Sequence, residues 1–210
     1  MSDRTVLISG AGIGGSTLAY WLARRGFRPT VVELAGGLRS SGNPVDVRGP
    51  AVAVAEEMGV MPRLRAAASN VTHLSFVDAA DERVGQIDLR AFEMSDGGEV
   101  EVPRADLASI LLEAGRDAAE FLWNDTIVEL HQDPRGVNVA FEHADPRRFD
   151  LVIGADGLHS RVRRLAFGPE RDFVHHMGIY VATLALEQQI DDDSRVVMYN
   201  TPGKAVSVHP

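Results

Sequence analysis

The stretch Leu7–Ser16, "LISGAGIGGS", places four glycines within the six positions from Gly10 to Gly15, directly after an apolar run. Glycine loses more backbone freedom on folding than any other residue, so such a cluster needs a specific reason. The residues before it, Thr5–Ile8, are β-branched or apolar and predict a buried strand. The stretch therefore predicts a strand followed by an unusually tight turn.

The residues after the glycines predict a helix and a second strand. Apolar residues recur at helical spacing from Ser16 onward, and Gly26 ends this pattern. A second β-branched run, Thr30–Val32, stops at Glu33. Strand, turn, helix and strand together form a βαβ unit, which implies two parallel strands joined by a right-handed crossover.

The glycine spacing matches the pattern G-x-G-x-x-G. Gly10 permits the tight turn, Gly12 lets a pyrophosphate approach the backbone, and Gly15 lets the helix lie close to the strand. The helix N-terminus adds unpaired N–H groups and a partial positive charge that attract phosphate. We therefore predict a dinucleotide site that also includes Ile13 and Gly14. The alternative is a glycine turn that only packs a helix.

Glu33 follows the glycines by about 20 residues, the spacing at which a carboxylate reaches an adenosine ribose in this motif. We expect it to accept hydrogen bonds from both ribose hydroxyls. The alternative is an ordinary exposed carboxylate at the end of a strand.

Composition limits the remaining function classes. The chain has 210 residues, 45% of them hydrophobic, which suits one domain or one and a half closely joined domains. It contains no cysteine, and its net charge of −9 argues against a nucleic-acid surface. No signal-peptide pattern or membrane-length apolar stretch is present, so we expect a cytoplasmic protein without a membrane partner.

The rest of the chain does not continue with the βα units of an NAD-dependent dehydrogenase. We expect an irregular loop over 35–50 and helices over 51–58 and 104–119. The expected strands are 71–78, 82–89, 121–123, 127–132, 137–142, a single buried strand 149–153, 179–186 and 195–199. In the strand 179–186, the alternation of Tyr180, Ala182, Leu184 and Leu186 predicts one buried sheet face.

Four separated motifs resemble the FAD-dependent aromatic hydroxylases, the single-component flavin monooxygenases of the p-hydroxybenzoate hydroxylase type. Within this family, the polyketide- and tetracycline-modifying members are the most similar in the general character of their sequences. The motifs are "GAGIGG" with Glu33, "LRSSGNPVDVRG" (38–49), "VPRADLASILLEA" (102–114) and "DLVIGADGLHSRVRR" (150–164). They occur in the family's order and extend over most of the chain.

The resemblance implies FAD as cofactor and NAD(P)H as co-substrate, and it implies five further cofactor-binding positions. These are Arg39, Arg104, Val128, Asp156 and Gly157. Three of them have a simpler alternative: a solvated loop arginine for Arg39, a plain strand residue for Val128, and a helix cap for Asp156. Arg104 opens a helix, where the dipole disfavours a cation, so an anionic ligand would explain it.

We expect structural roles for the other clusters of polar residues. Ser160 is a second candidate cap for the helix after Asp156, and the arginines at 161, 163 and 164 suit a solvated face. His159, His175 and His176 lack a third ligand at metal spacing, so we predict no metal site.

The fold implied by the resemblance is α/β, a Rossmann-like FAD/NAD(P)-binding domain with an inserted, mostly antiparallel substrate sheet. We expect the FAD-binding domain to comprise 1–70 and 100–168, and a partial substrate domain to comprise 71–99 and 169–210. The family's third motif, a Gly-Asp segment, has no match here, so we expect the substrate sheet and the flavin pocket to be incomplete. A chain of this kind would bind FAD loosely and self-associate through an open sheet edge or pair with a missing segment.

The implied reaction is hydroxylation of an aromatic or polyketide-like small molecule by O2, through a flavin C4a-hydroperoxide. The flavin carries this chemistry, and we nominate no catalytic side chain. Two alternatives stay open, another FAD- or NAD(P)-dependent oxidoreductase on the same fold and a non-catalytic dinucleotide-binding protein.

Overall fold

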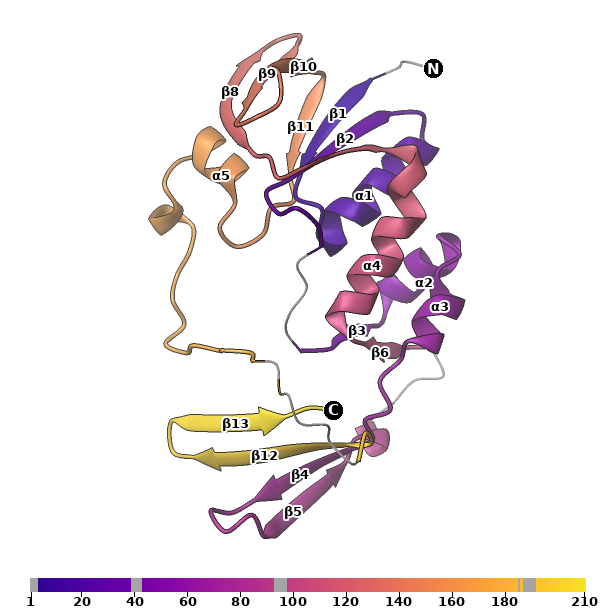
Figure 1. The fold of residues 1–210 in the computed structure, drawn as a ribbon, viewed down its shortest axis with the longest axis vertical. Coiled ribbons are helices and arrows are strands. Elements are labelled where there is room, and N and C mark those ends of the chain that lie inside the picture. Colours follow the sequence, from indigo (N-terminus) through magenta and orange to yellow (C-terminus); the bar gives the residue numbers. More distant parts are fainter. Residues whose placement is uncertain (1–3, 39–42, 93–97, 185, 187–191) are drawn as a thin grey trace.

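Figure 1 shows the computed structural model of the chain, which describes residues 4–38, 43–92, 98–184, 186 and 192–210. A parallel sheet with its helices lies at one end of the molecule, and a second sheet lies at the other end. The glycine-rich turn belongs to the parallel sheet, so that part is described first.

The predicted βαβ unit is confirmed. Its elements are β1 (Thr5–Ser9), α1 (Ile13–Arg24) and β2 (Arg28–Glu33). β1 and β2 pair in parallel, with Val6 opposite Pro29 and Ser9 opposite Val32. The helix begins at Ile13, before the apolar pattern does, because its first turn consists of residues of the glycine motif.

Two more strands complete the parallel sheet, which has the order β11-β1-β2-β7. They are β7 (Glu120–Trp123) and β11 (Leu151–Gly154). The prediction of a single buried strand over 149–153 is wrong, since Phe149 ends β10 (Arg147–Phe149) in another sheet. The chain changes sheets at Asp150, whose carboxylate accepts a hydrogen bond of 2.7 Å from the backbone N–H of Thr5.

The two faces of the parallel sheet are covered differently, as Figure 1 shows. Val6, Ile8 and Val31 pack under α1, whereas Leu7 and Val32 pack against the antiparallel sheet β10-β9-β8. This alternation follows from the two-residue period of a strand. The covering elements are α4 (Arg104–Gly115), which packs beside α1, and the strands β8 (Ile127–Asp133) and β9 (Gly136–Phe141).

A small helical layer lies between the parallel sheet and the second sheet. It comprises β3 (Val45–Val47), α2 (Pro50–Glu57), α3 (Met61–Ala66) and β6 (Val100–Val102). The prediction of α2 is confirmed, whereas α3 and β6 were not predicted. The loop predicted over 35–50 contains β3, which pairs antiparallel with β6. A three-residue strand is too short to show a period, and its partner lies more than 50 residues away in the chain.

The second sheet has the order β13-β12-β4-β5. Its strands are β4 (His73–Val77), β5 (Arg83–Asp88), β12 (Arg195–Thr201) and β13 (Lys204–Val208). The strands predicted over 71–78 and 82–89 are confirmed as β4 and β5, which pair antiparallel, and β12 pairs with β4 in parallel. Segments from the middle and the end of the chain therefore share one sheet, which is otherwise antiparallel.

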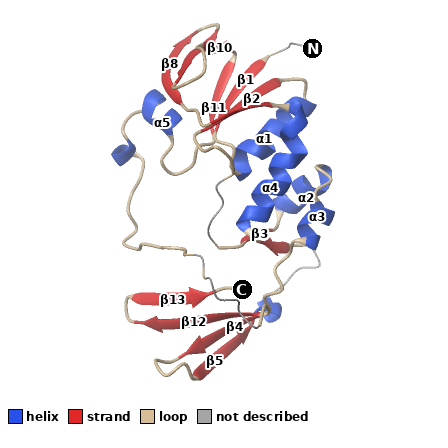
Figure 2. Ribbon diagram, in the orientation of Figure 1, coloured by secondary structure: helices blue, strands red, loops and turns tan. Residues whose placement is uncertain are grey.

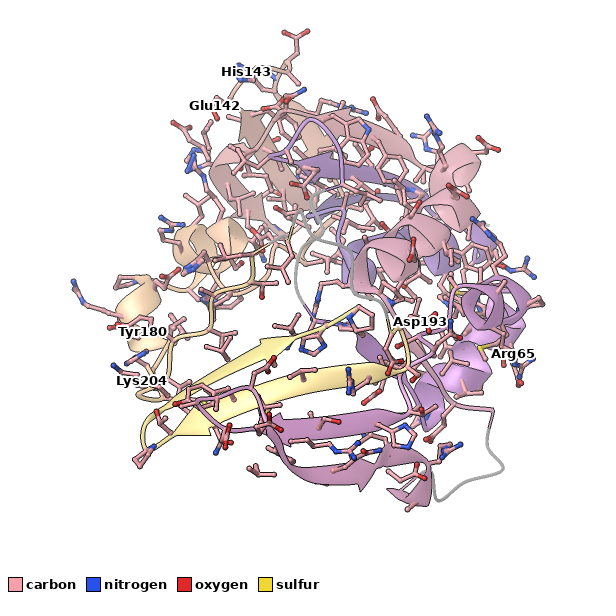
Figure 3. The ribbon with its side chains drawn as sticks, turned by 60° about the horizontal axis from the view of Figure 1, so that its bottom comes forward. Arg65, Glu142, His143, Tyr180, Asp193 and Lys204 are labelled. Carbon is pink, nitrogen blue, oxygen red and sulfur yellow. The ribbon has the colours of Figure 1, made fainter. Side chains whose placement is uncertain are left out.

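The prediction of a strand over 179–186 is wrong for the residues that the structure describes there. Residues 179–184 and 186 form no strand, and Figure 2 shows the segment before its grey part as loop. Tyr180 and Leu184 are 90% and 83% exposed, and Figure 3 labels Tyr180 beyond the end of the second sheet. The alternation is present, but this segment pairs with no described strand, and the ring of Tyr180 packs against His176, with the centroids 4.4 Å apart, and not into a sheet face. Residue 185 lies outside the described residues.

Three short 3-10 helices and one further α-helix complete the description: η1 (Leu89–Phe92), η2 (Arg116–Ala118), α5 (Arg161–Ala166) and η3 (Glu170–Asp172). The predicted helix over 104–119 ends earlier than expected, at Gly115, and continues as η2. No helix in the described ranges combines the length and apolar character needed to cross a membrane.

Candidate dinucleotide-binding site

The glycine turn leaves β1 at the carboxyl edge of the parallel sheet, and two of its glycines are required by close packing. Gly10 has φ of +103°, and a Cβ there would lie 2.6 Å from the carbonyl oxygen of Ala155. A Cβ on Gly15 would lie 1.8 Å from the carbonyl oxygen of Gly10. These contacts match the predicted roles of Gly10 in the turn and of Gly15 in helix packing.

Gly12 and Gly14 have the opposite environment. A Cβ on either residue would meet no described atom within 4 Å, so both backbones face open space. Gly12 is the N-cap of α1 and has no side chain to satisfy the first N–H groups of the helix. Ile13, the first helical residue, is followed by no acidic residue in the first turn. This uncapped, unobstructed helix start fits the pyrophosphate of a dinucleotide.

Glu33 lies at the end of β2 and is half-buried beside the glycine turn. Its Oε2 accepts a hydrogen bond of 2.9 Å from the backbone N–H of Ala11, and its Oε1 accepts one of 2.9 Å from Ala35. The carboxylate therefore connects the turn to the end of β2. Each carboxylate oxygen keeps a further lone pair, so acceptance from ribose hydroxyls remains compatible and stays a prediction.

The motif "DLVIGADGLHSRVRR" (150–164) meets the glycine turn at the same edge of the parallel sheet. β11 pairs with β1 in parallel, with Ser9 opposite Gly154, and Ala155 then donates its N–H to the carbonyl of Ser9 at 2.8 Å. Segments about 145 residues apart are thus brought together. In parallel α/β sheets this carboxyl edge is where ligands bind.

The carboxylate of Asp156 organises this junction. Its Oδ2 accepts hydrogen bonds from the backbone N–H groups of Arg161 at 2.8 Å and Val162 at 3.1 Å, and from Oγ of Ser9 at 3.2 Å. Ser160 also caps α5, since its Oγ accepts from the N–H of Arg163 at 3.0 Å. The helix-cap role for Asp156 is therefore present in the structure. Cofactor contact by Asp156 stays a prediction.

Gly157 follows at the exposed start of the next loop. Its φ is +75°, and a Cβ would meet nothing within 4 Å. The positive φ explains the glycine by itself. The open space beside it is compatible with the predicted cofactor contact.

The three other predicted cofactor-binding positions are Arg39, Arg104 and Val128. Arg39 lies outside the described residues. Arg104 is the exposed first residue of α4. Val128 lies where the pairing of β8 with β9 shifts register between Ile127 and Glu129, so it has no opposite residue in β9. A bulge of this kind leaves backbone groups available for other partners.

Several contacts of the site had no signal in the sequence. The hydroxyl of Ser9 and the guanidinium of Arg161 are examples: Nε of Arg161 donates to the carbonyl of Ile127 at 2.9 Å and ties α5 to β8. Serine at the end of a strand and arginine at the start of a helix are both common. Only the partner identifies the role, and the partner lies far away in the chain.

The surface beside Gly12 and Gly14 is open. Two hollows of the described surface, of about 550 and 790 Å³, are lined by other residues, among them Trp123 for the first and Arg147 for the second. Neither includes a residue of the glycine turn. In the described ranges, His, Asp and Glu form no cluster of three or more that could hold a metal ion.

The fold and this edge of the sheet define the class of the protein, an α/β dinucleotide-binding protein with a second sheet joined to it. The chain belongs to the family described as "FAD binding domain", whose model matches residues 3–210. The predicted fold class and the predicted cofactor, FAD, are thereby confirmed.

Curated relatives and solved structures are similar to this chain. "Uncharacterized protein MT1298" of Mycobacterium tuberculosis is 41% identical over 196 residues, which cover 90% of this chain and 52% of the relative. A "Flavin-dependent monooxygenase" from an unknown prokaryotic organism is 33% identical over 205 residues, covering 98% and 53%. The solved structure of tetracycline destructase Tet(55) superposes with a TM-score of 0.78 at 29% identity, covering 100% and 52%. The chain spans about half the length of the curated relatives it matches.

Proposed function

We propose that this chain forms the FAD-binding part of a flavin-dependent monooxygenase that uses O2 and NAD(P)H to hydroxylate an aromatic or polyketide-like small molecule. The observation that carries the cofactor assignment is a contrast within the glycine turn. A Cβ on Gly10 or Gly15 would clash with backbone atoms, whereas a Cβ on Gly12 would meet nothing within 4 Å. The reaction class is supported by the relative named as a flavin-dependent monooxygenase. The substrate class is supported by the likeness to a tetracycline destructase.

The residues of this chain would bind and orient the cofactor. Gly12 and the first N–H groups of α1 would receive the pyrophosphate, and Glu33 would accept from the adenosine ribose. Gly157 would approach the cofactor through its backbone at the start of the loop after β11. When bound, FAD supplies the redox chemistry with O2, so the proposal needs no side chain of this chain as nucleophile or base.

FAD binding and substrate binding are assigned to different parts of the chain. We assign 1–70 and 100–168 to FAD binding, and 71–99 and 169–210 to a partial substrate domain. Support comes from the second sheet, which combines β4 and β5 with β12 and β13. The substrate would lie over this sheet.

FAD binding tests the cofactor assignment directly. Quenching of flavin fluorescence on titration with this chain should show binding, and Gly12→Val should abolish it while Gly85→Val leaves it intact. The Cβ of residue 85 would lie 4.0 Å from a ring carbon of Phe76 in the second sheet, an ordinary contact away from the glycine turn. Binding of NAD(H) with no binding of FAD would contradict the assignment.

Hydroxylation needs a separate measurement. NAD(P)H oxidation under oxygen is followed with a panel of phenols and polyketides, and products are examined by mass spectrometry for the gain of one oxygen atom. Tight FAD binding without oxygen transfer to any member of the panel would favour a non-catalytic FAD-binding protein.

A further inference from the structure

The loop Gly157–Ser160, between β11 and α5, is held by a carboxylate from outside the motif. Oε1 of Glu170 lies 3.0 Å from Nδ1 of His159, and its Oε2 lies 3.6 Å from a terminal nitrogen of Arg163. Glu170 begins η3, after α5 has ended. One carboxylate therefore contacts both the loop and the helix that follows it.

Arg163 extends this contact to the loop backbone. Its terminal NH2 group donates to the carbonyl of Leu158 at 2.5 Å, and its guanidinium lies over the ring of Phe173 at 6.0 Å from the centroid. Arg164 also donates to the carbonyl of His159 at 3.4 Å. Two arginines of α5 are thus connected to the loop backbone, and Phe173, after Glu170, contacts one of them through its ring.

At its C-terminal end the loop is fixed by Ser160, which is buried and whose Oγ donates to Oδ1 of Asp156 at 2.5 Å, but its other three residues are exposed. Leu158 is 64% exposed, Gly157 is exposed, and the side chain of His159 is 76% exposed. Segments with few buried apolar contacts open at low free-energy cost. The contacts of Glu170 supply a restraint that packing does not.

The charge of Glu170 is favoured in this position. The hydrogen bond with His159, together with the charges of His159, Arg163 and Arg164, lowers the pKa of the Glu170 carboxyl below its ordinary value. The group therefore stays ionised near neutral pH, hydrogen-bonded with His159 and ion-paired with Arg163.

We propose that Glu170 is a positioning residue: through His159 and Arg163 it holds the loop Gly157–Ser160 in the conformation that receives FAD. The proposal deepens the proposed function and rests on it, because it requires that this loop contacts the cofactor. It assigns a role to a residue outside the sequence motifs. The role is indirect, since Glu170 acts on the loop and not on the cofactor itself.

The test compares Glu170→Ala and Glu170→Gln with the control Asp172→Ala. Asp172 lies in the same 3-10 helix, and its carboxylate lies 3.8 Å from Nε of the neighbouring Arg171. The FAD dissociation constant should rise about threefold to fivefold in Glu170→Ala, the range for exposed charged contacts. It should rise less in Glu170→Gln, which keeps one acceptor oxygen, and stay unchanged in Asp172→Ala.

One ligand-free measurement and one double-variant comparison of FAD binding separate positioning from general destabilisation. Backbone 15N order parameters of residues 157–159 should fall from about 0.85 toward 0.6 or below in Glu170→Ala, while those of β1 and α1 stay unchanged. The effect should also be coupled to His159: the double variant His159→Ala with Glu170→Ala should weaken FAD binding no more than the more severe single variant.

The outcomes distinguish this proposal from the proposed function. If the unaltered chain does not bind FAD, the proposed function fails and this inference fails with it. If the unaltered chain binds FAD and Glu170→Ala binds it equally well, the positioning role alone is overturned. Equal weakening by Glu170→Ala and Asp172→Ala would overturn it as well, because the effect would then belong to the charge and not to the contact.

Discussion

The carboxylate of Glu33 accepts a hydrogen bond of 2.9 Å from the backbone N–H of Ala11, so the end of β2 is joined to the middle of the glycine turn. Glu33 is thus part of the structure that shapes the glycine turn, as well as the predicted partner of the ribose. A substitution at this position acts on both the turn and the ligand, and an experiment must separate the two effects.

For Glu33→Ala we expect weaker FAD binding together with a measurable loss of stability. Hydrogen bonds to a charged group contribute about 1.5–3 kcal/mol each, so the loss of contacts from Ala11 and Ala35 lowers the free energy of unfolding. Urea unfolding of the ligand-free chain measures the structural part. The FAD dissociation constant measures the rest, and an unchanged FAD affinity would show that Glu33 serves the fold alone.

For Gly12→Val we expect loss of FAD binding from a protein that still folds. Gly12 has φ of −68° and ψ of −173°, a conformation open to any residue, and a Cβ there meets nothing within 4 Å. The added side chain would occupy the space of the pyrophosphate. Thermal unfolding followed by circular dichroism should match the unaltered chain, while flavin quenching should disappear. Retained FAD would refute the placement of the pyrophosphate.

Gly15→Ala is the opposite case, and we expect it to damage folding before any ligand is considered. The new Cβ would lie 1.8 Å from the carbonyl oxygen of Gly10, which is backbone and has no flexible side chain to yield. Overpacking of this kind costs about 1–3 kcal/mol or more. Urea unfolding of the ligand-free variant should show this loss. A normal midpoint would mean that α1 lies farther from β1 than the structure shows.

Acid sensitivity is predicted at Asp125, a buried residue between β7 and β8. Burial raises the pKa of Asp125, but hydrogen bonds from the backbone N–H groups of Ala144, Thr126 and His143 outweigh it and lower the pKa below the usual value. A folded pKa below the unfolded value of about 3.9 contributes stability above that pH, which is lost as the pH falls through the folded pKa.

Asp125→Asn should therefore cost about 1–3 kcal/mol at pH 7, since one side of the amide cannot accept a hydrogen bond. The difference between variant and unaltered chain should shrink as the pH falls below 3.9. Melting temperatures between pH 7 and pH 2.5 test this. A constant difference across that range would contradict the assignment of the lowered pKa to these backbone contacts.

The first 33 residues were predictable because their signals are local. The glycine spacing, the helical period after it and the β-branched run before Glu33 all lie within one βαβ unit. The positive φ of Gly10 and the close approach of Gly15 to Gly10 are local features, so both roles follow from the spacing of the glycines. The hairpin of β4 and β5 was predictable for the same reason, since one short turn joins its strands.

The tertiary structure alone decided which distant segments meet. The sequence by itself determined a dinucleotide turn followed by an acidic residue, but it did not show that Asp156 hydrogen-bonds Ser9 or that β12 lies parallel to β4. It also indicated a buried face at Tyr180 and Leu184 that the structure leaves exposed. An alternating pattern reports the period of a strand and not the presence of a neighbour. The contact of Asp156 with Ser9 and the pairing of β12 with β4 depend on partners more than 100 residues away, which only the folded chain supplies.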